Sequence, residues 1–241
     1  MATGEWIYGR QVVRLLLTSG ARRHPLRLAA TPRALAALGL GEFPDGLRPE
    51  LVDTRELERR TGSREHQGVA ALVPQFDYEE SEEVLTGDLI VALDEVSDPR
   101  NLGAVVRSAL AVGASSVVVP RHRSAMVTPA VVKASAGATE HLAIGRVPNL
   151  VGFLRHAARS GFWIYGTAGD AAVSYLNLDL TVRSVLVFGS EGRGLRRLVA
   201  ETCDELAAIP MRPPLDSLNV SVAAALLLFE ARRQRAAASG G

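Results

Sequence analysis

Apolar residues come in short runs, separated by longer stretches with a helical pattern of apolar and polar positions. In the second two thirds of the chain, five runs are apolar throughout and bounded by glycine or proline, which is typical of strands buried on both faces. These runs are Leu89–Leu93, Ser116–Val119, Phe162–Tyr165, Val185–Phe188 and Leu206–Ile209. The helical patterns are Asn101–Val112, Pro129–Ser135, Leu150–Arg159, Leu195–Thr202 and about Leu218–Gln234. This alternation predicts an α/β domain built on a doubly wound parallel sheet.

The first part of the chain has the same alternation on a smaller scale. Short apolar runs lie at Leu26–Ala30, Leu51–Val52 and Val69–Val73. Helical patterns lie at Gly9–Ser19, Thr31–Leu40 and Thr54–Arg60, and Thr31 with the following proline is typical of a helix start. We therefore expect a small α/β domain over residues 1–76.

An acidic segment separates the two patterned regions. Residues 77–83 read Asp-Tyr-Glu-Glu-Ser-Glu-Glu and show no apolar periodicity, so their charges repel one another and favour a solvated chain. We expect residues 77–88 to be a linker and residues 89–236 to form the second domain. The Ala/Ser/Gly-rich residues 237–241 are predicted to be a disordered tail.

Composition narrows the possible classes of protein. The 241 residues have a net charge of +1, and 26 of the 27 basic side chains are arginine, which suits bidentate phosphate contacts but also follows from a GC-rich genome. The single cysteine and five scattered histidines give no metal-ligand spacing, so we expect no structural metal and no disulfide. The longest apolar run, Val222–Phe229, is far shorter than the ~20 residues that cross a bilayer. With no leader sequence, these features predict a soluble, cytoplasmic protein with no membrane partner.

Candidate chemistry lies in the loops that follow the predicted strands, because ligands of open parallel sheets bind beyond the carboxyl ends of the strands. Three loops contain polar residues together with glycine or proline, which favour tight turns. They are Asp94–Arg107, in which Asn101 and Arg107 lie six residues apart, Phe188–Leu195 and Ile209–Ser221.

The glycines of the second loop fit none of the common nucleotide or nucleophile motifs. Gly189, Gly192 and Gly194 lack the spacing of a dinucleotide fingerprint, no lysine is near for a P-loop, and Ser190 directly follows Gly189, which excludes a nucleophile elbow. Taken alone, the loop is equally well explained as a strand-to-helix turn whose glycines permit positive φ.

Taken together, the three loops resemble the SpoU/TrmH branch of the SPOUT methyltransferases. The resemblance depends on Asn101-Leu-Gly with Arg107, on Gly189-Ser-Glu-Gly-Arg-Gly, and on Ile209-Pro-Met followed by Ser217-Leu-Asn-Val-Ser. Near the start, Ile7-Tyr-Gly, and at the end of the first domain, His66-Gln-Gly-Val-Ala, are similar to the RlmB type of that family. The resemblance covers essentially the whole chain.

The resemblance implies both an architecture and an activity. It implies that the second domain is an α/β knot, in which the chain forms a trefoil knot, and that the first is an RNA-binding domain similar to ribosomal protein L30. The implied reaction transfers a methyl group from S-adenosylmethionine to a ribose 2′-hydroxyl of RNA, in this type a guanosine of 23S rRNA. Similar proteins are homodimers that pair through the last helix and the first helix of the catalytic domain.

The same resemblance assigns roles to individual residues. The implied catalytic residues are Asn101, Arg107, Glu191, Ser217 and Asn219. The implied cofactor-binding residues are Thr167, Ala168, Gly189, Ile209, Met211 and Leu218. Arg22, Arg23, Arg193 and Arg196 are candidates for contacts with RNA phosphates. Since a guanidinium is a poor base near neutral pH, we expect Arg107 to hold the phosphate and stabilise the developing alkoxide, while the phosphate or a water accepts the proton.

One departure from the family and two alternative functions stay open. Many relatives have glycine after Ile-Pro-Met, where this chain has Pro213-Pro214, which fixes φ and removes two N–H donors. A catalytically silent RNA-binding protein of ribosome assembly is one alternative, although the intact set of polar residues disfavours it. A tRNA or antibiotic-resistance 2′-O-methyltransferase is the other.

Overall fold

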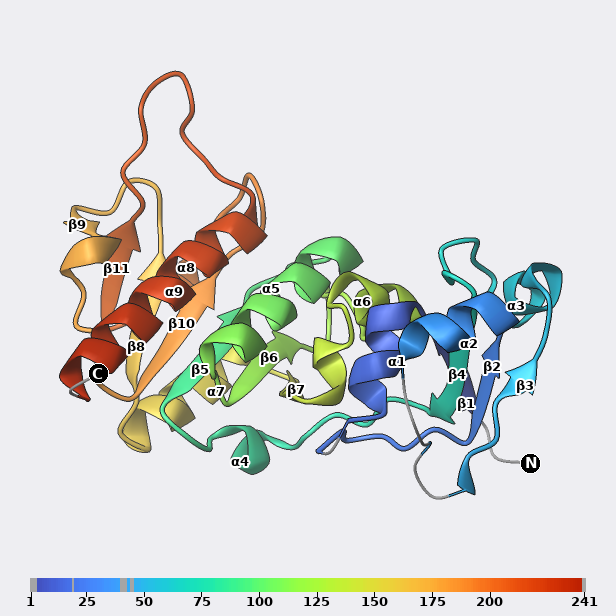
Figure 1. Ribbon diagram of the computed structural model, residues 1–241. Coiled ribbons are helices and arrows are strands. Elements are labelled where there is room, and N and C mark those ends of the chain that lie inside the picture. Colours follow the sequence, from blue (N-terminus) through green and yellow to red (C-terminus); the bar gives the residue numbers. More distant parts are fainter. Residues whose placement is uncertain (1–3, 19, 40–42, 44–45, 240–241) are drawn as a thin grey trace. The chain divides into compact units, whose positions relative to one another are not determined.

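The computed structural model describes residues 4–18, 20–39, 43 and 46–239, which form two compact units (Figure 1). The N-terminal unit consists of Met1–Asp77 and a later segment, Met126–His141. The C-terminal unit consists of Tyr78–Ala125 and Leu142–Gly241.

The described residues of the C-terminal unit form a seven-stranded sheet in which every neighbouring pair is parallel. The strand order is β7-β6-β5-β10-β8-β11-β9. The strands are β5 (Leu89–Leu93), β6 (Ser116–Pro120), β7 (Ala143–Val147), β8 (Trp163–Thr167), β9 (Val173–Ser174), β10 (Ser184–Phe188) and β11 (Glu205–Ala208). The central strands β5, β6 and β10 are buried at every position, which is why their sequences are apolar throughout.

Helices cover both faces of this sheet. In Figure 1, α5 and α9 lie in front of it and α7 lies behind it. The helices are α4 (Ser81–Val84), α5 (Pro99–Val112), α7 (Leu150–Arg159), α8 (Arg197–Ala200) and α9 (Val220–Ala238), with a 3-10 turn at Tyr175–Asn177. The predicted doubly wound α/β class is therefore confirmed.

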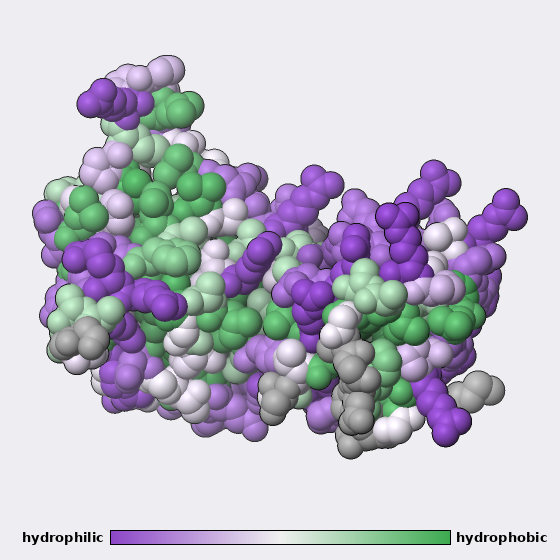
Figure 2. Space-filling model, viewed as in Figure 1, coloured by the Kyte–Doolittle hydropathy of each residue, from purple (hydrophilic) through white to green (hydrophobic). Residues whose placement is uncertain are grey.

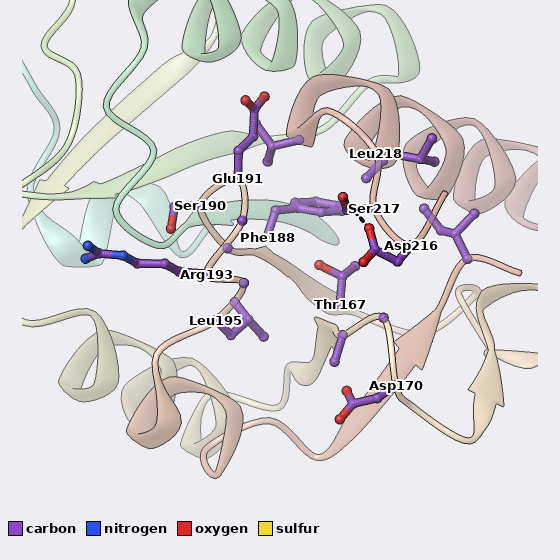
Figure 3. Close-up of a pocket in the computed structure, with 18 of the residues that line it drawn as sticks. Thr167, Asp170, Phe188, Ser190, Glu191, Arg193, Leu195, Asp216, Ser217 and Leu218 are labelled. Atoms are coloured by element: carbon purple, nitrogen blue, oxygen red, sulfur yellow. Dashed lines mark hydrogen bonds between the residues drawn. The ribbon is translucent and has the colours of Figure 1, made fainter. Parts of the chain in front are cut away.

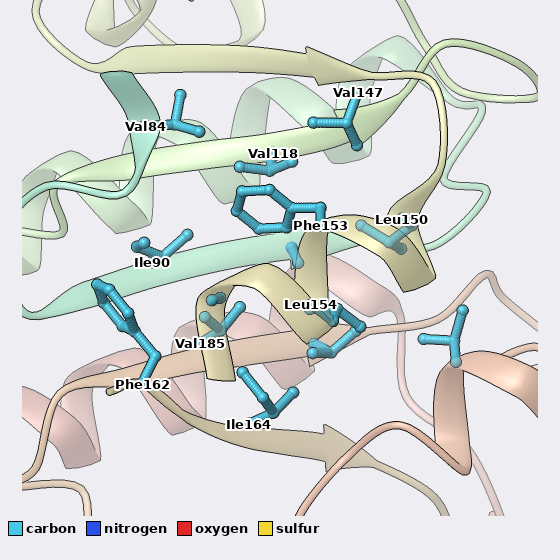
Figure 4. Packing of buried hydrophobic residues seen from close by; sticks show 14 residues of the cluster. Val84, Ile90, Val118, Val147, Leu150, Phe153, Leu154, Phe162, Ile164 and Val185 are labelled. Carbon is cyan, nitrogen blue, oxygen red and sulfur yellow. The ribbon is translucent and has the colours of Figure 1, made fainter. Parts of the chain in front are cut away.

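The core behind the sheet shows how the helical pattern specifies packing. Helix α7 buries Leu150, Phe153, Leu154 and Ala157, which repeat at helical spacing along one face. Figure 4 shows Leu150, Phe153 and Leu154 in one cluster with residues of four neighbouring strands, namely Ile90, Val118, Ile164 and Val185. Since burying each large apolar side chain stabilises a fold by ~1.5–3 kcal/mol, this layer fixes α7 firmly on the sheet.

The N-terminal unit is a four-stranded mixed sheet with its own helices. The strand order is β1-β4-β2-β3, with β4 antiparallel to both neighbours and β3 parallel to β2. The strands are β1 (Gly4–Tyr8), β2 (Arg27–Ala30), β3 (Glu50–Leu51) and β4 (Val69–Pro74). The helices are α1 (Arg10–Leu16), α2 (Pro32–Leu38), α3 (Thr54–Thr61) and α6 (Pro129–Ala134), with a 3-10 turn at Ala138–Glu140. As expected, Thr31 caps α2 and accepts a hydrogen bond from the Ala34 amide at 3.2 Å.

The structure differs from the expected domain boundaries in two places. Helix α6 was expected in the second domain, yet it packs on β1 and buries Val131 and Val132 in the N-terminal unit. The segment expected to be a solvated linker belongs to the C-terminal unit, because Val84 of α4 is fully buried in its core and the Glu79 amide bonds the Ile144 carbonyl at 3.0 Å. One apolar side chain among many acids was enough to anchor it.

The sequence pattern did not predict three of the described strands. Strand β1 begins with polar residues, β7 is interrupted by Gly145 and Arg146, and β9 has only two residues. The predicted tail also begins too early, because α9 continues through Ala237 and Ala238, while residues 240–241 lie outside the described part. None of the described helices is both long and apolar enough to cross a membrane. The trefoil knot and the L30-like fold of the first domain stay predictions.

Candidate active site

Three loops that follow β5, β10 and β11 meet at the carboxyl edge of the parallel sheet. Strands β5 and β10 are direct neighbours, and β11 is separated from β10 only by β8. The loops connect β5 to α5, β10 to α8 and β11 to α9. Residues more than 100 positions apart in the sequence are brought together in this way.

The side chains of Asn101, Glu191 and Asn219, one from each loop, form a closed hydrogen-bond network. The Asn101 Nδ2 donates to Glu191 Oε1 at 2.9 Å. The Asn219 Nδ2 donates to Asn101 Oδ1 at 3.0 Å and also to Glu191 Oε1. Two amide groups therefore fix the orientation of one carboxylate oxygen. Figure 3 shows that the Glu191 side chain extends away from Thr167 and Asp170 on the opposite wall of the neighbouring cavity.

Helix starts position the two amide side chains. Asp98 caps α5 by accepting a hydrogen bond from the Arg100 amide at 2.7 Å, and Pro99 begins the helix, so Asn101 lies in its first turn. Asn219 caps α9, and its Oδ1 accepts from the Ser221 amide at 2.9 Å. The side-chain oxygen of Asn219 thus caps the helix, and its side-chain nitrogen donates a hydrogen bond to Glu191.

A cavity of about 870 Å³ lies beside this network. All six residues expected to bind the cofactor line it, namely Thr167, Ala168, Gly189, Ile209, Met211 and Leu218. Phe188, Leu195, Leu206 and Val220 add apolar wall, and Asp170 and Asp216 add two carboxylates. Figure 3 shows Thr167 and Asp170, Phe188 and Leu195, and Asp216 and Leu218 around the cavity, at or after the carboxyl ends of β8, β10 and β11.

The loop Gly189–Leu195 is folded tightly against itself. The Gly194 amide donates to the Ser190 carbonyl at 2.9 Å, and Gly192 and Gly194 have φ of 78° and 66°. A Cβ on Gly189 would lie 2.1–2.3 Å from backbone atoms of Gly194 and Leu195. Glycine at 189 is therefore required by a close backbone approach, whereas glycine at 192 and 194 provides positive φ.

The cavity suits S-adenosylmethionine in size, polarity and charge. Its volume lies within the ~300–1,000 Å³ of small-molecule sites. Apolar walls from Ile209 and Leu218 fit an adenine face, and the carboxylates of Asp170 and Asp216 complement a ligand that carries a sulfonium and an ammonium group. The Pro213-Pro214 peptide, which is cis, lies outside the cavity wall.

Two expected catalytic residues lie outside the network. Ser217 lines the cavity, where its hydroxyl donates to Asp216 Oδ1 at 3.1 Å (Figure 3). Arg107 is exposed on α5, ~9 Å along the helix axis from Asn101, and makes no hydrogen bond or ion pair with any residue that the structure describes. Its guanidinium is therefore available to a ligand.

Of the four arginines expected to contact RNA, Arg23 and Arg196 are held by carboxylates. Arg23 is 7% exposed, and its guanidinium binds the buried Glu140 carboxylate at 2.7 and 2.9 Å and Glu5 at 2.6 Å. The expected phosphate contact of Arg23 is wrong, because the side chain is a buried structural cation. Arg196 binds Asp94, as described below, whereas Arg22 and Arg193 are exposed.

Sequence reasoning missed Asp94, which is 1% exposed at the carboxyl end of β5. Its carboxylate accepts from the Arg196 amide at 2.8 Å and from Arg196 Nε at 2.7 Å. A carboxylate that directly follows a buried parallel strand was the available signal, but no local pattern identified its partner 102 residues away.

This fold and site define an α/β protein that binds a small ligand at the carboxyl edge of its sheet. Residues 88–229 match the model of the SpoU rRNA Methylase family, and the chain belongs to this family. It is 38% identical to the 23S rRNA (guanosine-2'-O-)-methyltransferase RlmB of Vibrio vulnificus over 98% of this chain and 99% of that protein.

Solved structures agree with this assignment. A TrmH-family protein from Porphyromonas gingivalis is 30% identical, with a TM-score of 0.79 over 96% of this chain and 90% of the other. An AdoMet-bound rRNA methyltransferase from Sinorhizobium meliloti is 27% identical, with a TM-score of 0.75 over 95% of this chain and 87% of the other. AdoMet is S-adenosylmethionine, the cofactor that the family resemblance implies.

Proposed function

We propose that this protein methylates the ribose 2′-hydroxyl of a guanosine in 23S rRNA, with S-adenosylmethionine as the methyl donor. The observation that carries the proposal is the meeting of three sequence-distant motifs in one network beside a cavity that fits the cofactor. The full-length similarity to an enzyme named for this reaction supports the choice of substrate. An enzyme that modifies rRNA acts where rRNA is made, so the proposed location of this protein is the bacterial cytoplasm.

The residues around the cavity have separate roles in this reaction. Thr167, Ala168, Gly189, Ile209, Met211 and Leu218 hold the cofactor, largely through backbone and apolar contacts. The bound cofactor supplies an electrophilic methyl group on a sulfonium. The Asn101–Glu191–Asn219 network holds the loops after β5, β10 and β11 in register, so that the hydroxyl and the methyl group meet at the right distance.

Arg107 acts on the RNA. To attack a methyl group, the 2′-oxygen must give up its proton, and it carries partial negative charge as the proton leaves. An exposed guanidinium can bind the neighbouring phosphate and stabilise that charge, while the phosphate or a water accepts the proton. Ser217, on the cavity wall, orients either the cofactor or this phosphate.

RNA is held by other arginines and by the N-terminal unit. Arg22 and Arg193 are exposed and contact phosphates, so RNA affinity falls as salt is added. We expect the first 76 residues to bind RNA, so that their removal reduces methylation of rRNA and leaves cofactor affinity nearly unchanged.

The protein is also proposed to be a homodimer. Helix α9 carries exposed Val222, Leu226 and Phe229 at helical spacing, and Figure 2 shows apolar side chains gathered over this helix. A second copy that packs its own α9 here would bury this stripe. Sedimentation equilibrium at micromolar concentration should give twice the 25.7 kDa chain mass, and a monomer would contradict the pairing.

Methylation of 23S rRNA is tested directly by incubating the protein with unmodified rRNA and radiolabelled S-adenosylmethionine. We expect incorporation into 23S rRNA, and primer extension at low dNTP should stop next to one guanosine. Incorporation into tRNA alone, or at another nucleotide, would support the alternative 2′-O-methyltransferases. Binding of S-adenosylhomocysteine or RNA without any methyl transfer would support the silent RNA-binding protein instead.

A further inference from the structure

Asp94 is attached to both ends of the glycine-rich loop Gly189–Leu195. At the start of the loop, the Asp94 amide donates to the Phe188 carbonyl at 2.8 Å. At its end, the Asp94 carboxylate accepts from the Arg196 amide at 2.8 Å through Oδ2 and from Arg196 Nε at 2.7 Å through Oδ1. Arg196 Nη2 lies 2.7 Å from the same Oδ1. Asp94, which directly follows β5, therefore binds both ends of the loop.

The loop held in this way contributes to both parts of the site. Its residues Gly189–Leu195 line the cofactor cavity, and its Glu191 accepts the hydrogen bonds from Asn101 and Asn219. Asp94 itself is not part of the cavity wall. A change of the Asp94 carboxylate therefore acts on the cofactor indirectly, and the loop that it binds is the connection that the structure shows.

The ion pair is well suited to hold a fixed geometry. Asp94 is 1% exposed, whereas the Arg196 side chain is 47% exposed, and the carboxylate receives three donors from this single residue. The hydrogen bond with Asp94 raises the pKa of the Arg196 guanidinium. Glu95, next in the chain, has a positive φ of 57° and lies 3.6 Å from Arg196 Nη1, which adds a second carboxylate to the same guanidinium.

We propose that Asp94 and Arg196 are a positioning pair, which sets the shape of the Gly189–Leu195 loop for cofactor binding and for the alignment of Glu191. The inference deepens the proposed function and rests on it. It replaces the expected role of Arg196 in RNA binding, because the Arg196 guanidinium is already directed at two carboxylates.

The test compares Asp94→Asn and Arg196→Gln with a neighbouring control. Arg197→Gln removes the same charge one residue later, from a side chain that is 78% exposed and pairs only with Glu201 among the described residues. Calorimetric titration with S-adenosylhomocysteine should show an affinity roughly tenfold lower or worse for both test variants, because the binding-competent loop is less populated, and an unchanged affinity for the control.

Two further readouts separate positioning from simple stability. Hydrogen exchange of the peptide spanning Gly189–Leu195 should become faster in both test variants while the α7 peptide stays protected. Single-turnover methylation at saturating cofactor and RNA should be slower, with RNA affinity unchanged. The double variant Asp94→Asn/Arg196→Gln should be no worse than the worse single variant, since both remove one interaction.

Arg196→Lys provides the test if the other variants do not fold. It keeps the charge beside Asp94 but cannot supply both side-chain contacts, so we expect a smaller loss of S-adenosylhomocysteine affinity than for Arg196→Gln. Wild-type S-adenosylhomocysteine affinity in every folded variant, or lower RNA affinity for Arg196→Gln with no effect of Asp94→Asn, would overturn the inference. A wild-type protein that binds no S-adenosylhomocysteine would overturn the proposed function itself.

Discussion

Gly189→Ala tests whether the tight loop determines cofactor binding. The new Cβ would lie 2.1 Å from the Gly194 carbonyl carbon, 2.2 Å from its oxygen and 2.3 Å from the Leu195 nitrogen. Ordinary contact begins near 3.4 Å, so the far side of the loop must move by roughly 1 Å. All three atoms belong to the backbone, and no side-chain rotation can relieve the clash.

The energetic consequence follows from the strain of overpacking, which is typically ~1–3 kcal/mol. If only the observed loop shape binds the cofactor, the apparent dissociation constant rises by the inverse of that shape's population, which is ~5–150-fold. Calorimetric titration with S-adenosylhomocysteine measures this directly.

The matched control is Gly192→Ala in the same loop. Its Cβ would meet no atom within 4 Å, and the positive φ of 78° alone penalises alanine by ~1–2 kcal/mol. We expect a smaller loss of affinity than at position 189. Equal affinities for Gly189→Ala and the wild-type protein would refute the argument that the loop's backbone contact shapes the cavity.

Three other outcomes are expected. In single-turnover assays, Arg107→Ala should bind S-adenosylhomocysteine normally but transfer the methyl group ~10²-fold or more slowly, and Arg107→Lys should restore little of the rate. If saturating RNA rescues the Arg107→Ala rate, Arg107 only binds the phosphate in the ground state. Arg23→Ala should lower the free energy of unfolding by ~3 kcal/mol in urea titrations, because it leaves the fully buried Glu140 carboxylate unpaired. An unchanged stability together with weaker RNA binding would support the original expectation that Arg23 contacts RNA. Burial raises the pKa of the Cys203 thiol to about 12, so iodoacetamide at pH 8 should react at least ~100-fold more slowly with the native than with the unfolded protein. The rate of the native protein should increase as the pH rises, and equal rates for the native and unfolded protein would contradict this burial.

The sequence was most informative where a local pattern is sufficient. Fully apolar runs specify buried parallel strands, and the rule that ligands bind beyond their carboxyl ends selected the three loops. The family resemblance then selected Asn101, Glu191 and Asn219 within these loops, and the structure joins these side chains. The same rule could not show that Ser217 faces the cavity rather than the network, because neighbouring residues of one loop point in different directions.

Long-range partners were beyond the reach of the sequence. Arg22 and Arg23 look alike in sequence, but Arg23 is buried because Glu140 lies opposite it, 117 residues later. The pattern of α6 predicts a helix with an apolar face, but it does not say which sheet that face covers. In the same way, the acidic residues around Val84 concealed a side chain that the core requires.

The discontinuous N-terminal unit has a consequence for synthesis on the ribosome. Its sheet is complete in sequence by Asp77, but α6 and the Glu140 partner of Arg23 belong to Met126–His141. At ~5–20 residues per second, the 64 residues from Tyr78 to His141 take about 3–13 s to make. For that interval Arg23 has Glu5 but not Glu140 as a partner, and β1 lacks the contact with α6. The first unit is therefore completed only after β5 and β6, two strands of the second unit's sheet, have been made.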